Sequence, residues 1–91
     1  MSGDVRNNPE QNRFELEAEG HTAIAVYALS PGVITFTHTE VPKQLEGRGI
    51  GSTLARGALD AARALGLKVV ARCPFIAAHI RKYPEYQDLL E

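Results

Sequence analysis

The fold of this 91-residue chain is decided by one central stretch, Glu46-Gly47-Arg48-Gly49-Ile50-Gly51. Glycine occupies every second position, so no Cβ atom stands between the backbone and a ligand there. Apolar residues then recur at intervals of three and four, which predicts a helix that starts in this loop: Ile50, Leu54, Ala58, Ala61 and Leu65. A helix N-terminus presents unpaired amides and a positive dipole end. The stretch therefore predicts a strand-to-helix loop that binds an anion such as a diphosphate.

The segment before the loop is rich in β-branched and aromatic residues and predicts three strands, 13–19, 22–29 and 33–41. The joints between them are short. Gly20 supports the first turn, and Ser30-Pro31-Gly32 suits a tight type II turn, so we expect an antiparallel three-stranded meander. The second strand is apolar on both alternating faces, which predicts a central strand covered on both sides.

The third strand carries the first candidate site residues. Strict alternation places Ile34, Phe36, His38 and Glu40 on one face. An apolar row on that face thus ends in two ionisable side chains. This pattern indicates a site at the end of the strand.

The rest of the chain predicts one further strand and one further helix. Gly66 is a natural C-terminal cap for the first helix, residues 67–72 predict a short buried strand, and Pro74 suits the first turn of a second helix. Pro84 ends that helix, and residues 85–90 can form a last helical turn or two. Residues 1–11 are rich in Asn, Gly and charge, which predicts a flexible tail before a single domain over 12–91. The expected fold class is a mixed α/β (α+β) domain in which the meander is followed by α-β-α.

Composition excludes several classes of partner. The formal net charge is −1 and no polybasic stripe occurs, so we expect no nucleic acid partner. The apolar runs fall short of the roughly 20 residues that a membrane span needs, and the N-terminus has no apolar signal core, so we expect a cytoplasmic protein without a membrane partner. We also expect a monomer or weak dimer. The single cysteine, Cys73, forms no internal disulfide and has no metal-ligand spacing around it, so no metal is expected.

Two common phosphate motifs do not fit the loop. A P-loop needs Gly-Lys before its Ser or Thr, whereas Ser52 follows Gly51 directly. A dinucleotide fingerprint needs Gly-x-Gly-x-x-Gly in a first βαβ unit, whereas this loop is Gly-x-Gly-x-Gly and follows an antiparallel meander. Triphosphate and dinucleotide chemistry are therefore disfavoured.

The stretch 41–65 closely resembles the acetyl-CoA loop and helix of the GCN5-related N-acetyltransferase superfamily. Its pattern, Gln/Arg-x-x-Gly-x-Gly/Ala, falls on 46–51, with Glu46 where Gln or Arg is usual. Together with His38-Thr39-Glu40-Val41-Pro42, Cys73-Pro74-Phe75 and Tyr83-Pro84-Glu85-Tyr86, residues 12–90 resemble the minimal YjdJ-type and N-acetyltransferase-domain-containing family. The resemblance implies the acyl-CoA N-acyltransferase fold.

The resemblance also implies acetyl-CoA as the cofactor. The diphosphate would lie on backbone amides of the loop, helped by Arg48 or Ser52, because an acidic Glu46 cannot strengthen phosphate binding by its side chain. The strand before the loop would run beside the pantetheine arm. The implied cofactor-binding residues are Val41, Pro42, Glu46, Gly47, Arg48, Gly49, Ile50, Gly51, Ser52 and Cys73.

Three residues are candidates for catalysis. Glu40 is the first choice for a general base, with His38 as partner or alternative, although the two can simply satisfy one another at a sheet edge. Cys73 precedes a helix start that favours a thiolate, so it can accept the acetyl group, or it can be inert packing. Direct transfer is the default mechanism of the superfamily.

Two tyrosines and one histidine complete the candidates. Tyr83 and Tyr86 are alternative general acids, with packing as the favoured role. His79, one turn before Tyr83, is expected to be surface-exposed.

Three functions follow from these residues. The first is an N-acetyltransferase that acts on a small amine or on a protein lysine or N-terminus. The second is a non-catalytic CoA-binding sensor or interaction module, because turns replace the helices that build the superfamily's acceptor site. The third is a structural domain in which the glycines serve packing alone.

Overall fold

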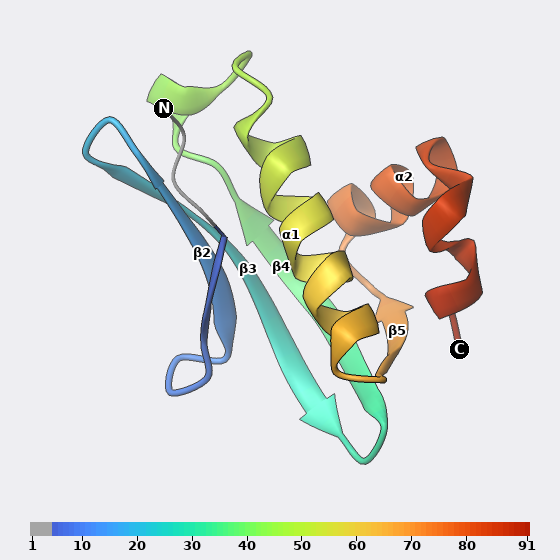
Figure 1. The fold of residues 1–91 in the computed structure, drawn as a ribbon. Helices are drawn as coiled ribbons and strands as arrows, with labels where there is room; N and C mark the ends of the chain where they lie inside the picture. Colours follow the sequence, from blue (N-terminus) through green and yellow to red (C-terminus); the bar gives the residue numbers. More distant parts are fainter. Residues whose placement is uncertain (1–4) are drawn as a thin grey trace.

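The computed structural model describes residues 5–91 as one sheet with helices packed against it (Figure 1). The elements, in chain order, are β1 (Arg6–Asn8), β2 (Arg13–Ala18), β3 (His21–Ser30), β4 (Val33–Glu40), the 3-10 turn η1 (Lys43–Leu45), α1 (Ile50–Ala64), β5 (Lys68–Ala71), α2 (Pro74–Lys82) and the 3-10 segment η2 (Pro84–Leu89). The predicted mixed α/β class is confirmed. Within residues 5–91, neither helix is long and apolar enough to span a bilayer.

The five strands lie in the sheet in sequence order. β1 to β4 pair antiparallel, and β5 pairs parallel to β4 after the α1 crossover. The predicted meander of three strands was therefore one strand short, because β1 adds a fourth. Residues 6–8 were expected in a flexible tail, but the Tyr27 hydroxyl donates a 2.6 Å hydrogen bond to Asn7 Oδ1 and ties them to the sheet. Residues 1–4 of that expected tail lie outside the described residues.

Glycine ends α1 in the manner that the sequence predicted. Gly66 has a φ of 72°, which is the left-handed conformation. The Gly66 amide donates to the Arg63 carbonyl at 3.0 Å, and the Leu67 amide donates to the Ala62 carbonyl at 2.9 Å. These two bonds form a Schellman motif, which turns the chain directly into β5.

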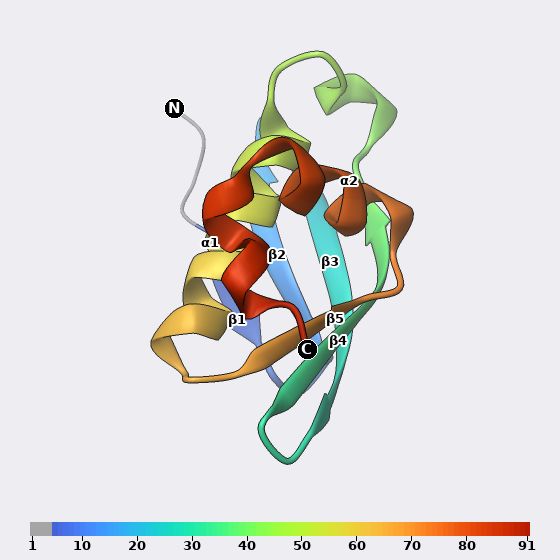
Figure 2. The same cartoon turned by 90° about the vertical axis from the view of Figure 1, so that its right-hand side faces the viewer.

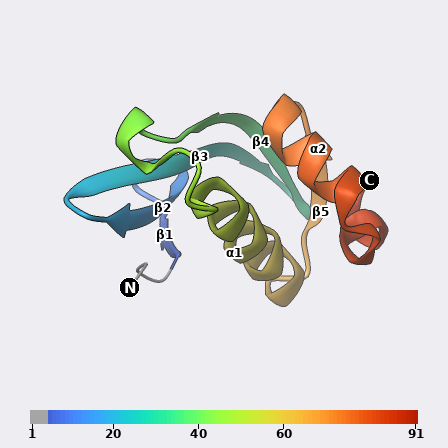
Figure 3. The same cartoon turned by 90° about the horizontal axis from the view of Figure 1, so that it is seen from above.

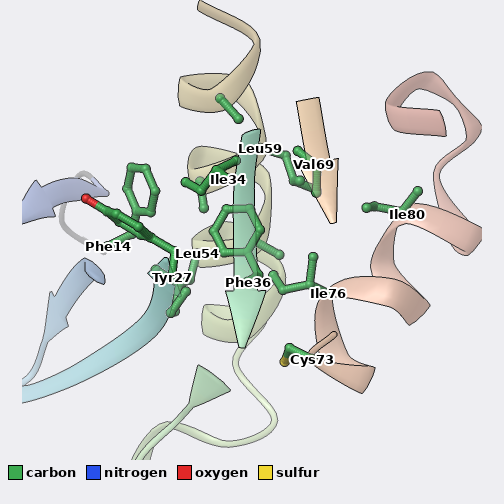
Figure 4. Close-up of a cluster of buried hydrophobic side chains, with 14 of the residues drawn as sticks. Phe14, Tyr27, Ile34, Phe36, Leu54, Leu59, Val69, Cys73, Ile76 and Ile80 are labelled. Atoms are coloured by element: carbon green, nitrogen blue, oxygen red, sulfur yellow. The ribbon is translucent and has the colours of Figure 1, made fainter. Parts of the chain in front are cut away.

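The core lies between one face of the sheet and the two helices. Phe14, Tyr27 and Phe36 meet at its centre with ring centroids 5.3–6.4 Å apart. Figure 4 shows Leu54 of α1 and Ile76 of α2 directed toward this aromatic group. One apolar cluster therefore joins both helices to the same sheet face.

The opposite face of the sheet is open. Figure 3 shows the sheet curving over α1, with α2 beside it at the β5 end. Ile24 and Val26, on the face of β3 away from the helices, are half-buried, and no helix within residues 5–91 covers them. The prediction that β3 is covered on both sides is wrong for the described residues.

The C-terminal segment fixes α2 against α1 (Figure 2). Arg63 of α1 donates to both carboxylate oxygens of Asp88, at 2.8 and 2.9 Å. The Tyr86 hydroxyl donates to Asp60 at 3.0 Å. These bonds join the C-terminal half of α1 to η2, which packs against α2.

Candidate functional site

One cleft of about 780 Å³ opens where β4 ends. The end of β4 forms one wall, the glycine loop and the first turn of α1 form another, and α2 contributes one side chain. The lining residues are Thr22, Thr39, Glu40, Val41, Pro42, Leu45, Glu46, Gly47, Gly49, Ile50, Gly51, Ser52 and Phe75. A cleft of this size takes a ligand of cofactor dimensions.

The glycine loop exposes its backbone to the cleft. Gly47 and Gly49 have φ values of 82° and 73°, and a Cβ at either position would meet nothing within 4 Å. Leu45, which is 1% exposed, anchors the preceding turn η1 in the core. The loop is therefore anchored at Leu45 and carries no side chains at Gly47 and Gly49, so a ligand can approach the main chain closely.

The first turn of α1 supplies unpaired donors. The first bond into the helix is from the Thr53 amide to the Gly49 carbonyl, at 3.0 Å, so the amides of Ile50, Gly51 and Ser52 have no partner within the helix. No side chain among the described residues caps this end. These amides and the helix dipole form an anion-binding end of the cleft.

The predicted cofactor residues divide into two groups. All of them except Arg48 and Cys73 line the cleft. Arg48 is exposed and forms an ion pair with Glu19 in the β2–β3 turn. The guanidinium thus pairs with a carboxylate outside the cleft, and its contact with a phosphate stays a prediction.

Sequence reasoning missed four lining residues: Thr22, Thr39, Leu45 and Phe75. Thr22 and Leu45 carry no chemical signal that could have marked them. Phe75 lies in α2 together with Ile76 and Ile80, but those two are buried, whereas Phe75 is 41% exposed. Its position directly after Cys73-Pro74 was the available signal.

A β-bulge explains why Thr39 was missed. The register between β3 and β4 shifts at this point, because Tyr27 faces Phe36 whereas Val26 faces His38. Thr37 is the extra residue, and its hydroxyl donates to the Val26 carbonyl at 3.4 Å. An extra residue reverses the alternation of the side chains that follow it.

The bulge moves the predicted acid–base pair to the open face. His38 and Glu40 lie opposite Val26 and Ile24 on that face, and not in line with Phe36. The prediction that they continue the buried apolar row is wrong. His38 Nε2 lies 2.8 Å from a Glu40 carboxylate oxygen, and both side chains are more than half exposed. The pair can accept a proton from a group that approaches across the open face.

Because of the bulge, Thr39 faces inward where His38 or Glu40 was expected. Its Oγ1 lies 3.1 Å from the Sγ of Cys73, which is 3% exposed and precedes α2. β4 and β5 stop pairing just before this contact, at Phe36 and Ala71. Thr39 thus lies between the thiol and the cleft.

The remaining candidates lie away from the cleft. Tyr86 donates to Asp60, and burial, followed by Asp60, raises the pKa of its phenol. The ring of Tyr83 packs against that of His79 at a tilt of 41°, with centroids 4.6 Å apart. His79 was expected on the surface but is 6% exposed, and burial lowers its pKa, with Arg56 as the next contribution. Among residues 5–91, no group of His, Cys, Asp and Glu side chains has the arrangement of a metal site.

The fold and the site define a two-layer α/β domain whose cleft lies between the end of a bulged strand and a helix N-terminus with unpaired amides. The profile of the GCN5-related N-acetyltransferase family matches residues 13–89. The chain belongs to this family.

Named relatives agree with this assignment. The chain is similar to protein NATD1 of Mus musculus, with 28% identity over 96% of this chain and 84% of that protein. NATD1 of Gallus gallus is 30% identical over 93% of this chain and 80% of that protein. The NMR solution structure of a GCN5-like protein from Staphylococcus aureus superposes with a TM-score of 0.74 at 27% identity, covering 97% of this chain and 87% of that one.

Proposed function

We propose that this protein binds acetyl-CoA in the cleft and transfers the acetyl group to an amine. One observation carries the proposal. The same cleft contains the unpaired amides at the α1 N-terminus and apolar walls from Val41, Pro42 and Phe75. A donor with a diphosphate and a long, weakly polar arm matches both parts. Family membership supports the same donor class.

The residues of the cleft match the two parts of this donor. The amides of Ile50, Gly51 and Ser52 would hold the diphosphate, and the bare loop at Gly47 and Gly49 lets it approach. When bound, acetyl-CoA supplies the acetyl group as an activated thioester. The arm would run along the end of β4 past Val41 and Pro42.

The proton acceptor in this proposal is Glu40, oriented by His38. The 2.8 Å contact holds the carboxylate on the open face where β4 ends, and Glu40 is also one of the residues that line the cleft. An amine must lose a proton to attack a carbonyl, and an exposed carboxylate–imidazole pair can take it. Because no helix of residues 5–91 covers the open face, an amine on a protein surface can reach Glu40 as readily as a small molecule.

We propose direct transfer, without an acetylated cysteine. Cys73 is buried and does not line the cleft, and Thr39 lies against its sulfur. An acyl-enzyme would require Thr39 to move aside. A Cys73→Ala variant that transfers acetyl at the wild-type rate supports the direct route, and a loss of transfer with unchanged acetyl-CoA binding contradicts it.

The donor is tested by calorimetric titration of acetyl-CoA into matched glycine variants. Gly49→Ala and Gly32→Ala both place a side chain at a positive φ with open space around it, so both cost about 1 kcal/mol of backbone strain. Gly32 lies in the β3–β4 turn, at the other end of the sheet from the cleft. We expect Gly49→Ala alone to weaken binding. Absence of binding to the wild-type protein at high micromolar acetyl-CoA contradicts the proposal.

Turnover is tested with radiolabelled acetyl-CoA and a mixed panel of amines and peptides. Glu40→Gln should lower the transfer rate by about 10²- to 10⁴-fold, the usual contribution of a general base, while acetyl-CoA affinity stays unchanged. Glu10→Gln, in the β1–β2 turn, is the control. Acetyl-CoA binding without transfer to any acceptor would identify the chain as a CoA-binding module.

A further inference from the structure

The cleft contains an exposed aromatic ring that the packing of the fold does not require. Among the described residues, four large hydrophobic side chains are exposed: Leu29, Leu65, Phe75 and Leu90. Of these, Phe75 is the only aromatic residue and the only one that lines the 780 Å³ cleft. An apolar ring kept in water inside a cleft is typical of a surface that a ligand covers.

The ring of Phe75 packs against Gly51 of α1. A Cβ built on Gly51 would lie 2.7 Å from the ring Cζ and 3.3–3.4 Å from the two Cε atoms. Gly51 does not have a positive φ, so backbone conformation does not demand glycine there. The approach of the ring does demand it, because any side chain at position 51 would occupy the space of the ring edge.

This contact places an aromatic wall next to the anion-binding amides. The amide of Gly51 is one of the unpaired donors, and the ring touches the same residue. Val41 and Pro42 contribute apolar surface from the end of β4. A ligand that runs from the amides into the cleft therefore passes Phe75 directly after its anionic part.

We propose that Phe75 is a donor-specificity residue, which contacts the pantetheine arm next to the diphosphate and makes the cleft prefer CoA over a nucleotide without the arm. The inference rests on the proposed function, since it assigns one part of that donor to one side chain. Gly51 acts as the positioning residue that seats the ring. The diphosphate is held by the amides, independently of the ring.

The test compares two ligands on matched variants. ADP carries the diphosphate without the arm, and CoA carries both. Phe75→Ala should lower CoA affinity about tenfold, in keeping with the loss of a buried aromatic contact, and change ADP affinity by less than about twofold. Leu65→Ala removes an apolar side chain that is even more exposed, 63% against 41%, at the C-terminal end of α1, and should change neither affinity. Amide chemical-shift titration measures CoA and weakly bound ADP on the same scale.

A double-mutant cycle tests the contact between the Phe75 ring and Gly51. Gly51→Ala should push Phe75 into the cleft and weaken CoA binding severalfold, whereas the same change on a Phe75→Ala background should have little effect, because no ring remains to be displaced. Phe75→Leu, which keeps apolar bulk without the ring, should lie between wild type and Phe75→Ala. Thermal unfolding of each variant confirms that the fold is retained.

The outcomes separate the inference from the function on which it rests. If wild-type protein binds no CoA, the proposed function fails. If wild-type protein binds CoA but Phe75→Ala binds it equally well, or loses CoA and ADP affinity in equal measure, the inference is overturned while the donor assignment stands. Additive effects of Gly51→Ala and Phe75→Ala would also overturn it.

Discussion

Replacing His79 with phenylalanine should remove a pH-dependent loss of stability. The imidazole is 6% exposed, and its Nε2 has no hydrogen-bond partner among the described residues. Its ring packs against Tyr83 and Tyr86, with centroids 4.6 and 5.8 Å apart. Burial is the main cause of its lowered pKa. The folded protein therefore resists protonation of a group that the unfolded chain protonates freely.

Some charged groups around His79 lower its pKa and others raise it. Arg56 on α1 and Lys82 on α2 lower its pKa, whereas Glu85 at the start of η2 and Asp60 on α1 raise it. Burial outweighs the two carboxylates, so the net pKa lies below the ordinary value of 6.5. The neutral imidazole is the form that the fold accepts.

The sign and size of the effect follow from proton linkage. Between the folded and unfolded pKa values of His79, the unfolded chain binds more protons, so the free energy of unfolding falls as the pH decreases below about 6.5. The loss is about 1.4 kcal/mol for each unit by which the two pKa values differ. In a domain of this size, 1 kcal/mol corresponds to roughly 4–8 °C in Tm.

Urea unfolding at about pH 7, 6 and 5 measures the effect. Phenylalanine preserves ring contacts with Tyr83 and Tyr86 and removes the proton site, and any overpacking cost is independent of pH. The stability of His79→Phe relative to wild type should therefore rise as the pH falls, and His79→Gln should show the same trend. Equal pH slopes for wild type and both variants would refute the reasoning. Glu15 and Asp88, whose pKa values are lowered by hydrogen bonds from Arg13 and Arg63, lose their stabilisation only at lower pH.

Three further predictions concern the fold. Leu54→Ala, at a fully buried position under the aromatic group, should cost about 2–5 kcal/mol in urea unfolding, and a cost below about 1 kcal/mol would contradict the packing described. Gly66→Ala should cost about 1 kcal/mol, because the Schellman motif holds this residue at a φ of 72°, and an unchanged unfolding midpoint would argue against that motif. Gly57→Ala would place a Cβ 2.5 Å from Val5, so amide exchange in β1 should accelerate while the rest of the sheet stays protected, and unchanged exchange in β1 would contradict the contact.

Elements with strong local signals were predictable from sequence. The helix period and Gly66 defined α1 to within a residue, and Pro31-Gly32 and Pro74 marked the β3–β4 turn and the start of α2. These signals depend on the residues inside each element or next to it. The glycine loop likewise depends on local chemistry, which is why its backbone role in the cleft could be proposed before the structure.

Features set by distant partners were not predictable. β1 has a polar sequence and depends on the contacts of Asn7 with Tyr27 and of Val5 with Gly57. His79 is buried because η2 folds back over α2, which the pattern of α2 alone does not reveal. The bulge at Thr37 is set by the pairing of β4 with β3, and the residues of β4 alone carry no signal for it. Sequence could therefore identify His38 and Glu40 as chemically notable but not the face on which they lie.

The bulge also constrains the number of residues in β4. Thr37 divides the strand into two lengths of opposite phase, so that Phe36 and Thr39 point inward, whereas His38 and Glu40 point outward. Gain of one residue between Thr37 and Glu40 would exchange the inward and outward sets that follow it and bring a carboxylate against Cys73, whereas loss of Thr37 would remove the bulge and keep both sets in place. Changes of side chain in this segment alter one contact at a time. An insertion after Thr37 changes all of them together, so insertions should be tolerated here far less than substitutions.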